Sequence, residues 1–332
     1  SGYNNQTIRC AVKLFIRYRT ILKGFLMNIF DRLEILIGTQ GLEKLSRSHV
    51  CIFGLGGVGA AAAMDLVRSG IGTLTVFDFD TVQSSNLNRL YFGYRSEIGK
   101  SKTQVFMEYA KNINPTITIH EHNVLVSSKQ KPEYNAGHNH SESNTEMRHS
   151  ATAAPFETIS ARDIPLSCDF YLDCIDTLAP KLAVLSILLE QKLPFASSMG
   201  TGGRLCPELL KISSIWETRG CPLAQRVRTR LRKFGFLEPI KQNKKQFPDR
   251  CADFLCVWSD EPPVKPRMPN QTEQGNSSSL STYSFESDHS TDSEYAYKEI
   301  RKRGEQGSSA FVPQTAGHML ASLCVRKLLG KL

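Results

Sequence analysis

Three features are missing from the sequence: a long uncharged hydrophobic run, a Cys-x-x-Cys pair and an internal repeat. Without a stretch of about 18 apolar residues, we expect no transmembrane span. The nine cysteines occur singly and no secretory signal precedes them, which favours reduced thiols in the cytoplasm over a disulfide framework. Cys251 and Cys256 stand five apart with no matching pair, so we also expect no structural zinc site.

Positive charge, in contrast, is abundant. The 332 residues carry a net charge of +9, and 40% of them are hydrophobic. A chain of this length can bury a sizeable core in one large domain or in two smaller ones. Its charge favours an anionic partner such as nucleic acid or phosphate, although a solvated basic face is the simpler explanation.

The first 26 residues stand apart from the rest of the chain. Residues 10–27 are apolar but interrupted by basic side chains, so they could form a basic amphipathic anchor with peripheral membrane contact, or a transit-like segment. Met27 comes just before the first convincing motif. Residues 1–26 are therefore either a native N-terminal extension or a segment upstream of the natural start, and the fold prediction leaves them out.

Alternating strands and helices predict the fold. The pattern indicates strands over 49–53, 73–77, 116–124, 170–175, 194–198 and 254–258, helices over 58–69, 102–112, 179–191, 221–234 and 314–329, and a β arm over 209–216. This order favours a doubly wound, mostly parallel Rossmann-like α/β sheet with helices on both faces and a smaller C-terminal part of strand and helix.

Composition divides the chain further. Two polar stretches, both rich in Ser, predict loop insertions or disordered segments. We therefore expect a first βαβ half at 27–126, an insertion at 127–155, a second half with a basic helix at 156–260, a second insertion at 261–305, and a C-terminal segment and helix at 306–332. His138 and His140 lie in the first insertion, where we expect loop residues rather than a metal site.

A glycine-rich turn follows the first predicted strand and opens the first predicted helix. It reads Gly54-Leu-Gly56-Gly57-Val-Gly59. Such glycines let the backbone approach a phosphate, and the helix N-terminus adds partial positive charge. Asp78 ends the next strand, where a carboxylate can bind ribose hydroxyls. Taken alone, the pattern predicts a nucleotide site, most commonly that of an NAD- or FAD-dependent dehydrogenase.

Four further motifs favour a different enzyme. They are Asp78-Phe-Asp80-Thr-Val, Ser85-Asn86-Leu-Asn88-Arg89, Gly99-Lys100-Ser101-Lys102 and Asp173-Cys-Ile-Asp176. In this order and spacing the chain resembles the ThiF/MoeB family, relatives of the ubiquitin-activating enzymes. A dehydrogenase would have no evident need for Asn86, Arg89 and Lys102 together. One departure is Leu90, which stands where the family usually has Gln.

The resemblance implies that the half at 27–126 binds ATP and, with Mg²⁺, activates a carboxylate as an acyl-adenylate. The implied ATP-binding residues are Gly54, Gly56, Gly57, Gly59, Asp78, Asp80, Asn86, Arg89 and Lys102. Asp78 would hold the ribose, and Asp176 would bind the magnesium. Because the transition state of adenylation gathers negative charge, nearby cations such as Arg89 and Lys102 should supply much of the catalysis.

Arg32 is a further candidate catalytic residue. It lies just upstream of the first predicted strand, in the segment 31–38. In the family, an arginine at this place reaches into the ATP site of the neighbouring subunit, so the resemblance implies a homodimer. An exposed arginine beside an apolar helix is the simpler explanation.

Later motifs narrow the resemblance to the branch of tRNA threonylcarbamoyladenosine dehydratases. They are Cys221-Pro-Leu-Ala-Gln-Arg-Val-Arg-Thr-Arg-Leu-Arg-Lys-Phe-Gly, Asp253-Phe-Leu-Cys-Val-Trp-Ser-Asp-Glu and Ala310-Phe-Val-Pro-Gln-Thr-Ala-Gly. This branch implies adenylation of the threonyl carboxylate of the modified adenosine beside the tRNA anticodon. Ring closure would then displace AMP, which makes the net reaction a dehydration driven by ATP.

The basic helix predicted over 221–234 agrees with an RNA substrate. Its candidate RNA-binding residues are Arg226, Arg228, Arg230, Arg232 and Lys233. Arg226, Arg230 and Lys233 share one helix face, which suits contacts with backbone phosphates. Phe234 and Phe236 could stack on an unpaired base, although core packing is the commoner role. A solvated basic helix remains the simpler alternative.

Three other functions stay open at this stage. The chain could activate the C-terminus of a ubiquitin-like or sulfur-carrier protein, with Cys221 at a helix start as the thiol that forms a thioester. It could be a binding module that keeps the fold without turnover, which intact Arg89, Lys102 and Asp176 disfavour. It could also be an NAD oxidoreductase, which tight NAD binding without ATP binding would indicate.

Overall fold

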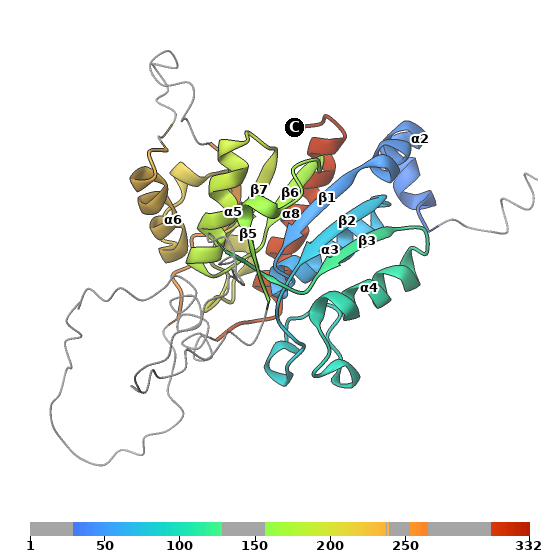
Figure 1. Ribbon diagram of the computed structural model, residues 1–332, viewed down its shortest axis with the longest axis horizontal. Coiled ribbons are helices and arrows are strands. Elements are labelled where there is room, and N and C mark those ends of the chain that lie inside the picture. The colour runs from blue at the N-terminus through green and yellow to red at the C-terminus, as the bar shows by residue number, and fades with distance from the viewer. Residues whose placement is uncertain (1–28, 128–156, 237, 239–252, 265–306) are drawn as a thin grey trace, which may run out of the picture.

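The computed structural model describes residues 29–127, 157–236, 238, 253–264 and 307–332, and one seven-stranded sheet runs through it (Figure 1). The strands are β1 (His49–Phe53), β2 (Thr73–Phe77), β3 (Thr118–His122), β4 (Leu125–Ser127), β5 (Thr158–Ser160), β6 (Phe170–Asp173), β7 (Phe195–Ser198), β8 (Leu210–Ser214) and β9 (Leu255–Ser259). The longer helices are α2 (Asp31–Arg47), α3 (Gly57–Arg68), α4 (Lys102–Ile113), α5 (Leu178–Glu190), α6 (Pro222–Lys233) and α8 (Phe311–Leu328).

The strand order of the large sheet is β3-β2-β1-β6-β7-β9-β8. Neighbouring strands are parallel except β8 and β9 at one edge. The chain therefore winds outward from β1 in one direction, returns to β6 beside β1, and winds outward in the other direction. This topology confirms the predicted doubly wound, mostly parallel α/β fold.

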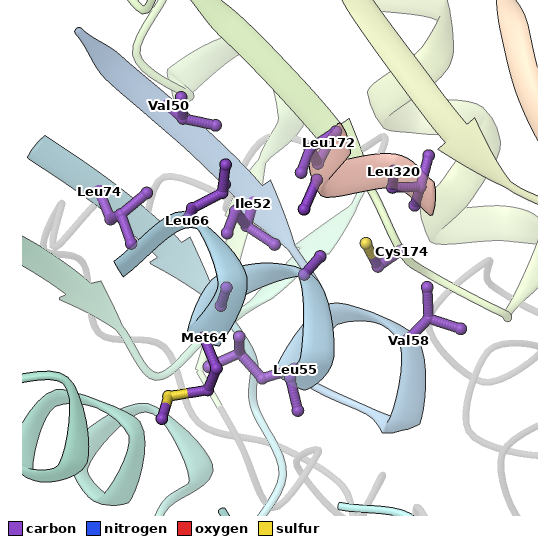
Figure 2. Packing of buried hydrophobic residues seen from close by; sticks show 14 of the residues in the cluster. Val50, Ile52, Leu55, Val58, Met64, Leu66, Leu74, Leu172, Cys174 and Leu320 are labelled. Carbon is purple, nitrogen blue, oxygen red and sulfur yellow. The ribbon is translucent and has the colours of Figure 1, made fainter. Parts of the chain in front are cut away.

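Each face of the central strands buries its own apolar layer, because successive side chains of a strand point to opposite sides. In β1, Val50 and Ile52 join the core beneath α3, α4 and α8, whereas Cys51 and Phe53 join the core beneath α5. Figure 2 shows the first of these layers, where Val50 and Ile52 lie beside Leu66 of α3. Burial on both faces explains why the last four residues of β1, 50–53, are an uninterrupted apolar run.

The last helix, α8, packs closely along α3, although the two are far apart in the sequence (Figure 1). Small residues allow this approach. A Cβ atom at Gly317 would lie 2.3 Å from the carbonyl oxygen of Val58 and 2.8 Å from the Cβ of Ala61. Because α8 contacts β6, β7, β8 and β9, the C-terminal segment covers the second half of the sheet, and it also abuts the N-terminal turn of α3.

Two segments differ from the sequence-based prediction. The strand predicted over 116–124 forms as β3, but β4, which follows it, was not predicted, and β4 pairs with β5 in a separate two-stranded sheet. Residues 209–216, expected as a β arm, instead supply β8, the antiparallel edge strand of the large sheet. Both differences arise because backbone pairing partners far along the chain decide which short segments form strands and where those strands lie.

Several predictions fall on parts of the chain outside the described residues. These are the extension at 1–26, His138 and His140, and most of the two insertions. The division of the chain into two halves at these insertions therefore stays a prediction. Among the helices that the structure does describe, none has the length and apolar character needed to span a membrane.

Candidate active site

A cleft of about 720 Å³ opens where the direction of winding reverses, at the C-terminal ends of β1 and β6. A doubly wound sheet binds its ligand at this position, because the loops that follow the two strands diverge there. Most of the predicted site residues line this cleft. They are Gly54, Gly56, Gly57, Asp78, Asp80, Asn86, Arg89, Lys102 and Asp176.

The glycine turn places backbone, rather than side chains, against the cleft. Gly54 adopts a left-handed conformation with φ of +88°, which favours glycine. A Cβ atom at Gly56 would meet nothing within 4 Å, so the backbone there borders open space. Gly59 differs from the prediction, because it lies inside α3 and a Cβ atom there would be 1.8 Å from the carbonyl oxygen of Gly54. Gly59 therefore serves close packing, and the N-terminal turn of α3 is the part suited to a phosphate.

A buried carboxylate and a buried lysine lie deeper in the cleft. One oxygen of Asp78 accepts a hydrogen bond from the N–H of Leu55 at 2.5 Å, and the other accepts from the N–H of Asp80 at 2.8 Å. The Nζ atom of Lys102 lies 2.7 Å from Asp80 and 3.8 Å from Asp78. Burial opposes the charge on Lys102, but the two carboxylates outweigh it and raise its pKa. Lys102 is therefore protonated at neutral pH.

The loop that carries Arg89 is fastened to the C-terminal segment. The guanidinium of Arg89 donates to the carbonyl oxygen of Ser85 at 2.8 Å and to Oδ1 of Asn88 at 3.0 Å. The side chain of Gln314 donates to the carbonyl oxygen of Arg89 at 3.2 Å, and Asn88 donates to that of Ser308 at 2.8 Å. Residues next to and within α8 thus hold the predicted phosphate-binding loop in place.

Asp176 is exposed in the loop between β6 and α5, and a buried cluster supports the start of this loop. One oxygen of Asp173 accepts from the N–H of Ile175 at 3.1 Å. Its other oxygen accepts from Nζ of Lys181 at 2.5 Å and from the hydroxyl of Ser197 at 2.6 Å. Asp173 was predicted only as part of a motif, and Lys181 and Ser197 were not predicted. A lysine within the mostly apolar helix α5 was the available signal.

The predicted RNA-binding residues of α6 do not share one environment. Arg226 is exposed and lines the cleft, and Arg230 and Lys233 are exposed on the same helix. Arg232 is also exposed, with its guanidinium 4.9 Å from the ring centre of Trp216. All four side chains are thus exposed on α6, and Arg232 also forms an ion pair with Glu238 at 3.8 Å.

Arg228 is turned toward the protein. Its side chain is half-buried, and its guanidinium donates to the carbonyl oxygen of Ile215 at 3.3 Å and to the hydroxyl of Thr218. Burial, with a contribution from the neighbouring charge of Arg232, lowers the pKa of Arg228. These bonds join α6 to the turn after β8, so Arg228 has a structural role that the helical spacing alone did not reveal.

Arg32 lies outside the cleft of its own chain. It is exposed on α2, a helix with a kink at Gly38, where φ is +76°. Two apolar neighbours on this helix, Ile35 and Leu36, are 80% and 75% exposed. Any contact of Arg32 with an ATP site would therefore require a second copy of the chain.

Cys221 and Arg204 both lie between β7 and α6, and of the two only Arg204 lines the cleft. Cys221, considered above as a thioester-forming thiol, is only 3% exposed and packs in an apolar cluster. This burial disfavours attack by its thiol on a large partner. Arg204 lines the cleft and is 2% exposed. Arg204 was not among the predicted site residues, although it follows a glycine-rich stretch at the C-terminal end of a strand, where binding loops of such sheets lie.

Comparison with known proteins agrees with this geometry. The tRNA threonylcarbamoyladenosine dehydratase of Bacillus subtilis is 26% identical over 305 residues, which cover 92% of this chain and 96% of that protein. The protein of the same name in Escherichia coli is 27% identical over 233 residues, covering 70% and 73%. The crystal structure of that E. coli protein, TcdA, in complex with ATP has the same fold, with a TM-score of 0.65, 23% identity and coverage of 91% and 94%. The model of the ThiF family matches residues 30–331, and the chain therefore belongs to the ThiF family.

Proposed function

We propose that the protein uses ATP to activate the threonyl carboxylate of threonylcarbamoyladenosine in tRNA and then closes it into a ring. A carboxylate oxygen attacks the α-phosphorus of ATP, the bond from this phosphorus to the bridging oxygen breaks, and pyrophosphate leaves. A carbonyl or amide of the same modification then attacks the activated acyl carbon. AMP leaves with the former carboxylate oxygen, so the substrate loses the elements of one water.

The observation that carries this proposal is that residues from all the family motifs line the same cleft. The glycine turn and the N-terminus of α3 suit phosphate oxygens, and Asp78 suits the ribose hydroxyls. Arg89 and Lys102 bring positive charge to the place where the transition state gathers negative charge. The substrate is inferred from the names of relatives, which align with this chain along most of their length.

We assign the magnesium ion that accompanies ATP to Asp176. Carboxylate and phosphate oxygens are the ligands that Mg²⁺ prefers, and the exposed carboxylate of Asp176 borders the cleft. The ion would neutralise charge on the phosphates. Asp176→Asn should therefore raise the Mg²⁺ concentration needed for half-maximal activity, whereas Asp163→Asn, at an exposed position outside the cleft, should leave it unchanged.

The test of the activity is pyrophosphate release from ATP and Mg²⁺, with tRNA that carries threonylcarbamoyladenosine compared with the same tRNA lacking it. We expect release only with the modified tRNA. Arg89→Ala should abolish it, and Arg162→Ala, at an exposed arginine outside the cleft, should not. Absence of release with either tRNA would refute the proposal, and ubiquitin-like carrier proteins would then be the next substrates.

We further propose that the active unit is a homodimer in which Arg32 reaches the ATP site of the other subunit. The exposed apolar residues beside it on α2 favour burial against a second copy. Mixing inactive Arg32→Ala and Arg89→Ala subunits should restore activity, because one site of each mixed dimer then has both arginines. A mixture as inactive as its components, from subunits shown to exchange, would contradict this arrangement.

A further inference from the structure

The two sides of the cleft differ in charge. The side formed by the loops after β2 and β6 contains three carboxylates, those of Asp78, Asp80 and Asp176, together with two cations assigned above to the ATP phosphates, Arg89 and Lys102. The side formed by the loop after β7 and the start of α6 contributes two arginines, Arg204 and Arg226, and no acidic residue among its described lining. The N-terminal turn of α6 lies on the same side and adds partial positive charge. An anion that enters beside the nucleotide would therefore be drawn to this second side.

Arg204 is the buried member of this pair. Its Nε donates to the carbonyl oxygen of Glu261 at 2.9 Å, and its Nη1 donates to the carbonyl oxygen of Gly200. Its Nη2 is buried and has no hydrogen-bond partner among the described residues. The nearby carboxylate of Glu261 accepts instead from the backbone N–H groups of Leu205 and Cys206, at 2.9–3.0 Å. The described structure thus leaves Arg204 without an anionic partner.

We infer that Arg204 recognises the substrate carboxylate that is to be activated, an inference that rests on the function proposed above. A buried cation without an anionic partner is unfavourable, and a carboxylate at this side of the cleft would supply the missing charge and acceptor. The low polarity of a buried site strengthens this attraction relative to water. Arg204 would then determine which modified adenosine is accepted, because an adenosine without a carboxylate leaves the guanidinium unpaired.

The two arginines suit different anions because they differ in exposure. Arg204 is 2% exposed, so the phosphate of a bulky polynucleotide backbone would reach it poorly, whereas a carboxylate on a slender side chain extending from a base can enter the cleft. Arg226 is exposed at the wall of the cleft and belongs to the basic helix. We therefore assign the carboxylate to Arg204 and a backbone phosphate of tRNA to Arg226.

A purely structural role for Arg204, bracing the loop after β7, is the competing explanation. Arg204→Lys and Arg204→Met distinguish the two roles, because both remove the guanidinium bonds to carbonyl oxygens but only the lysine keeps the charge. If Arg204 only braces the loop after β7, the two variants should lose the same amount of activity. Recognition of an anion would leave Arg204→Lys clearly more active than Arg204→Met at equal thermal stability.

The experiment measures pyrophosphate release with two substrates, modified tRNA and the free nucleoside threonylcarbamoyladenosine, which has the carboxylate but no phosphate. We expect Arg204→Met to raise KM for both substrates by roughly ten- to hundredfold, as for loss of a hydrogen bond to a charged group. The Kd for ATP should stay within about twofold, because this side of the cleft faces the substrate. Arg226→Gln should raise KM for tRNA alone.

The outcomes separate this inference from the proposed function. Wild-type protein that releases no pyrophosphate with modified tRNA refutes the function itself. If the wild type is active and Arg204→Met raises KM for tRNA but not for the nucleoside, Arg204 binds a phosphate. That result would overturn the inference. So would equal defects in Arg204→Lys and Arg204→Met. If the free nucleoside is not turned over by wild type, its Kd, measured by calorimetry in the presence of a non-hydrolysable ATP analogue, replaces KM.

Discussion

Gly56 and Gly59 stand three residues apart in one turn, yet the molecule requires each for a different reason. A methyl group at Gly59 would collide with the backbone of Gly54, whereas one at Gly56 would meet no protein atom and would project into the cleft. We expect Gly59→Ala to lower the free energy of unfolding by about 1–3 kcal/mol. Gly56→Ala should change it by less than about 0.5 kcal/mol but weaken ATP binding. Urea unfolding and calorimetric titration with ATP measure the two effects, and the reverse pattern would contradict these roles.

Single residues also show what the sequence could and could not predict about the site. The ATP-binding set was predictable because its members occur in short motifs with fixed spacing, each following a strand. Arg204 and Lys181 belong to no such motif, and their importance comes from burial, which depends on the packed structure. Arg228 had the helical spacing of its exposed neighbours, but spacing does not tell which side of a basic helix meets the turn after β8.

At the scale of elements, the cluster of Asp173, Lys181 and Ser197 connects β6, α5 and β7 beneath the cleft. None of the three side chains is exposed to solvent. Removing one member of a buried ion pair leaves the other charge uncompensated, which is far more costly than removing both. The cluster should therefore respond differently to single and to paired replacement.

We expect Lys181→Met to lower the free energy of unfolding by about 3–5 kcal/mol, because Asp173 would be left buried without its counter-charge. The double variant Lys181→Met with Asp173→Leu should regain most of this loss. Urea unfolding of both single variants and the double variant completes a thermodynamic cycle. Additive losses in the double variant would show that the two side chains are not coupled.

The helix α8 links stability to nucleotide binding. Gly317→Ala would place a methyl group against the backbone of Val58, forcing α8 away from α3 at a cost of about 1–3 kcal/mol. Gln314, which bonds the loop of Arg89, would move with the helix. We expect a lower melting temperature together with a raised Kd for ATP. Ser322→Ala, at an exposed position of the same helix, should change neither quantity.

Elements were predicted well where they are long or buried, and poorly where they are short. The apolar runs of β1 and β6 and the glycine turn after β1 were sufficient to predict a parallel doubly wound sheet. The short strand β4 was not predictable, because it pairs with β5 across the segment 128–156. Three-residue strands have too little periodicity of their own to be found without their partner.

For the whole molecule, the net charge of +9 predicts salt-dependent binding of tRNA. Each phosphate contact contributes about 0.7–0.9 to the slope of log K against log salt. We expect Arg230→Gln, on the exposed face of α6, to lower this slope by about 1. Arg228→Gln should reduce stability with little change of slope, because its guanidinium bonds to the protein. Filter binding between 50 and 200 mM salt, roughly the range where such effects are large, measures the slopes. Equal changes of slope in the two variants would argue against an RNA-binding role for Arg230 and a structural role for Arg228.

The position of α8 in the chain has a consequence for biosynthesis. Domains generally fold as they leave the ribosome, N-terminal parts first. Here α3 forms early, but the apolar face that it presents to α8 stays uncovered until residues 311–328 have been translated. The nucleotide-binding end therefore cannot acquire its final packing before α8 has been synthesised. Until then the nascent chain presents an apolar surface that chaperones recognise, and a premature stop codon before α8 would release a polypeptide prone to aggregation.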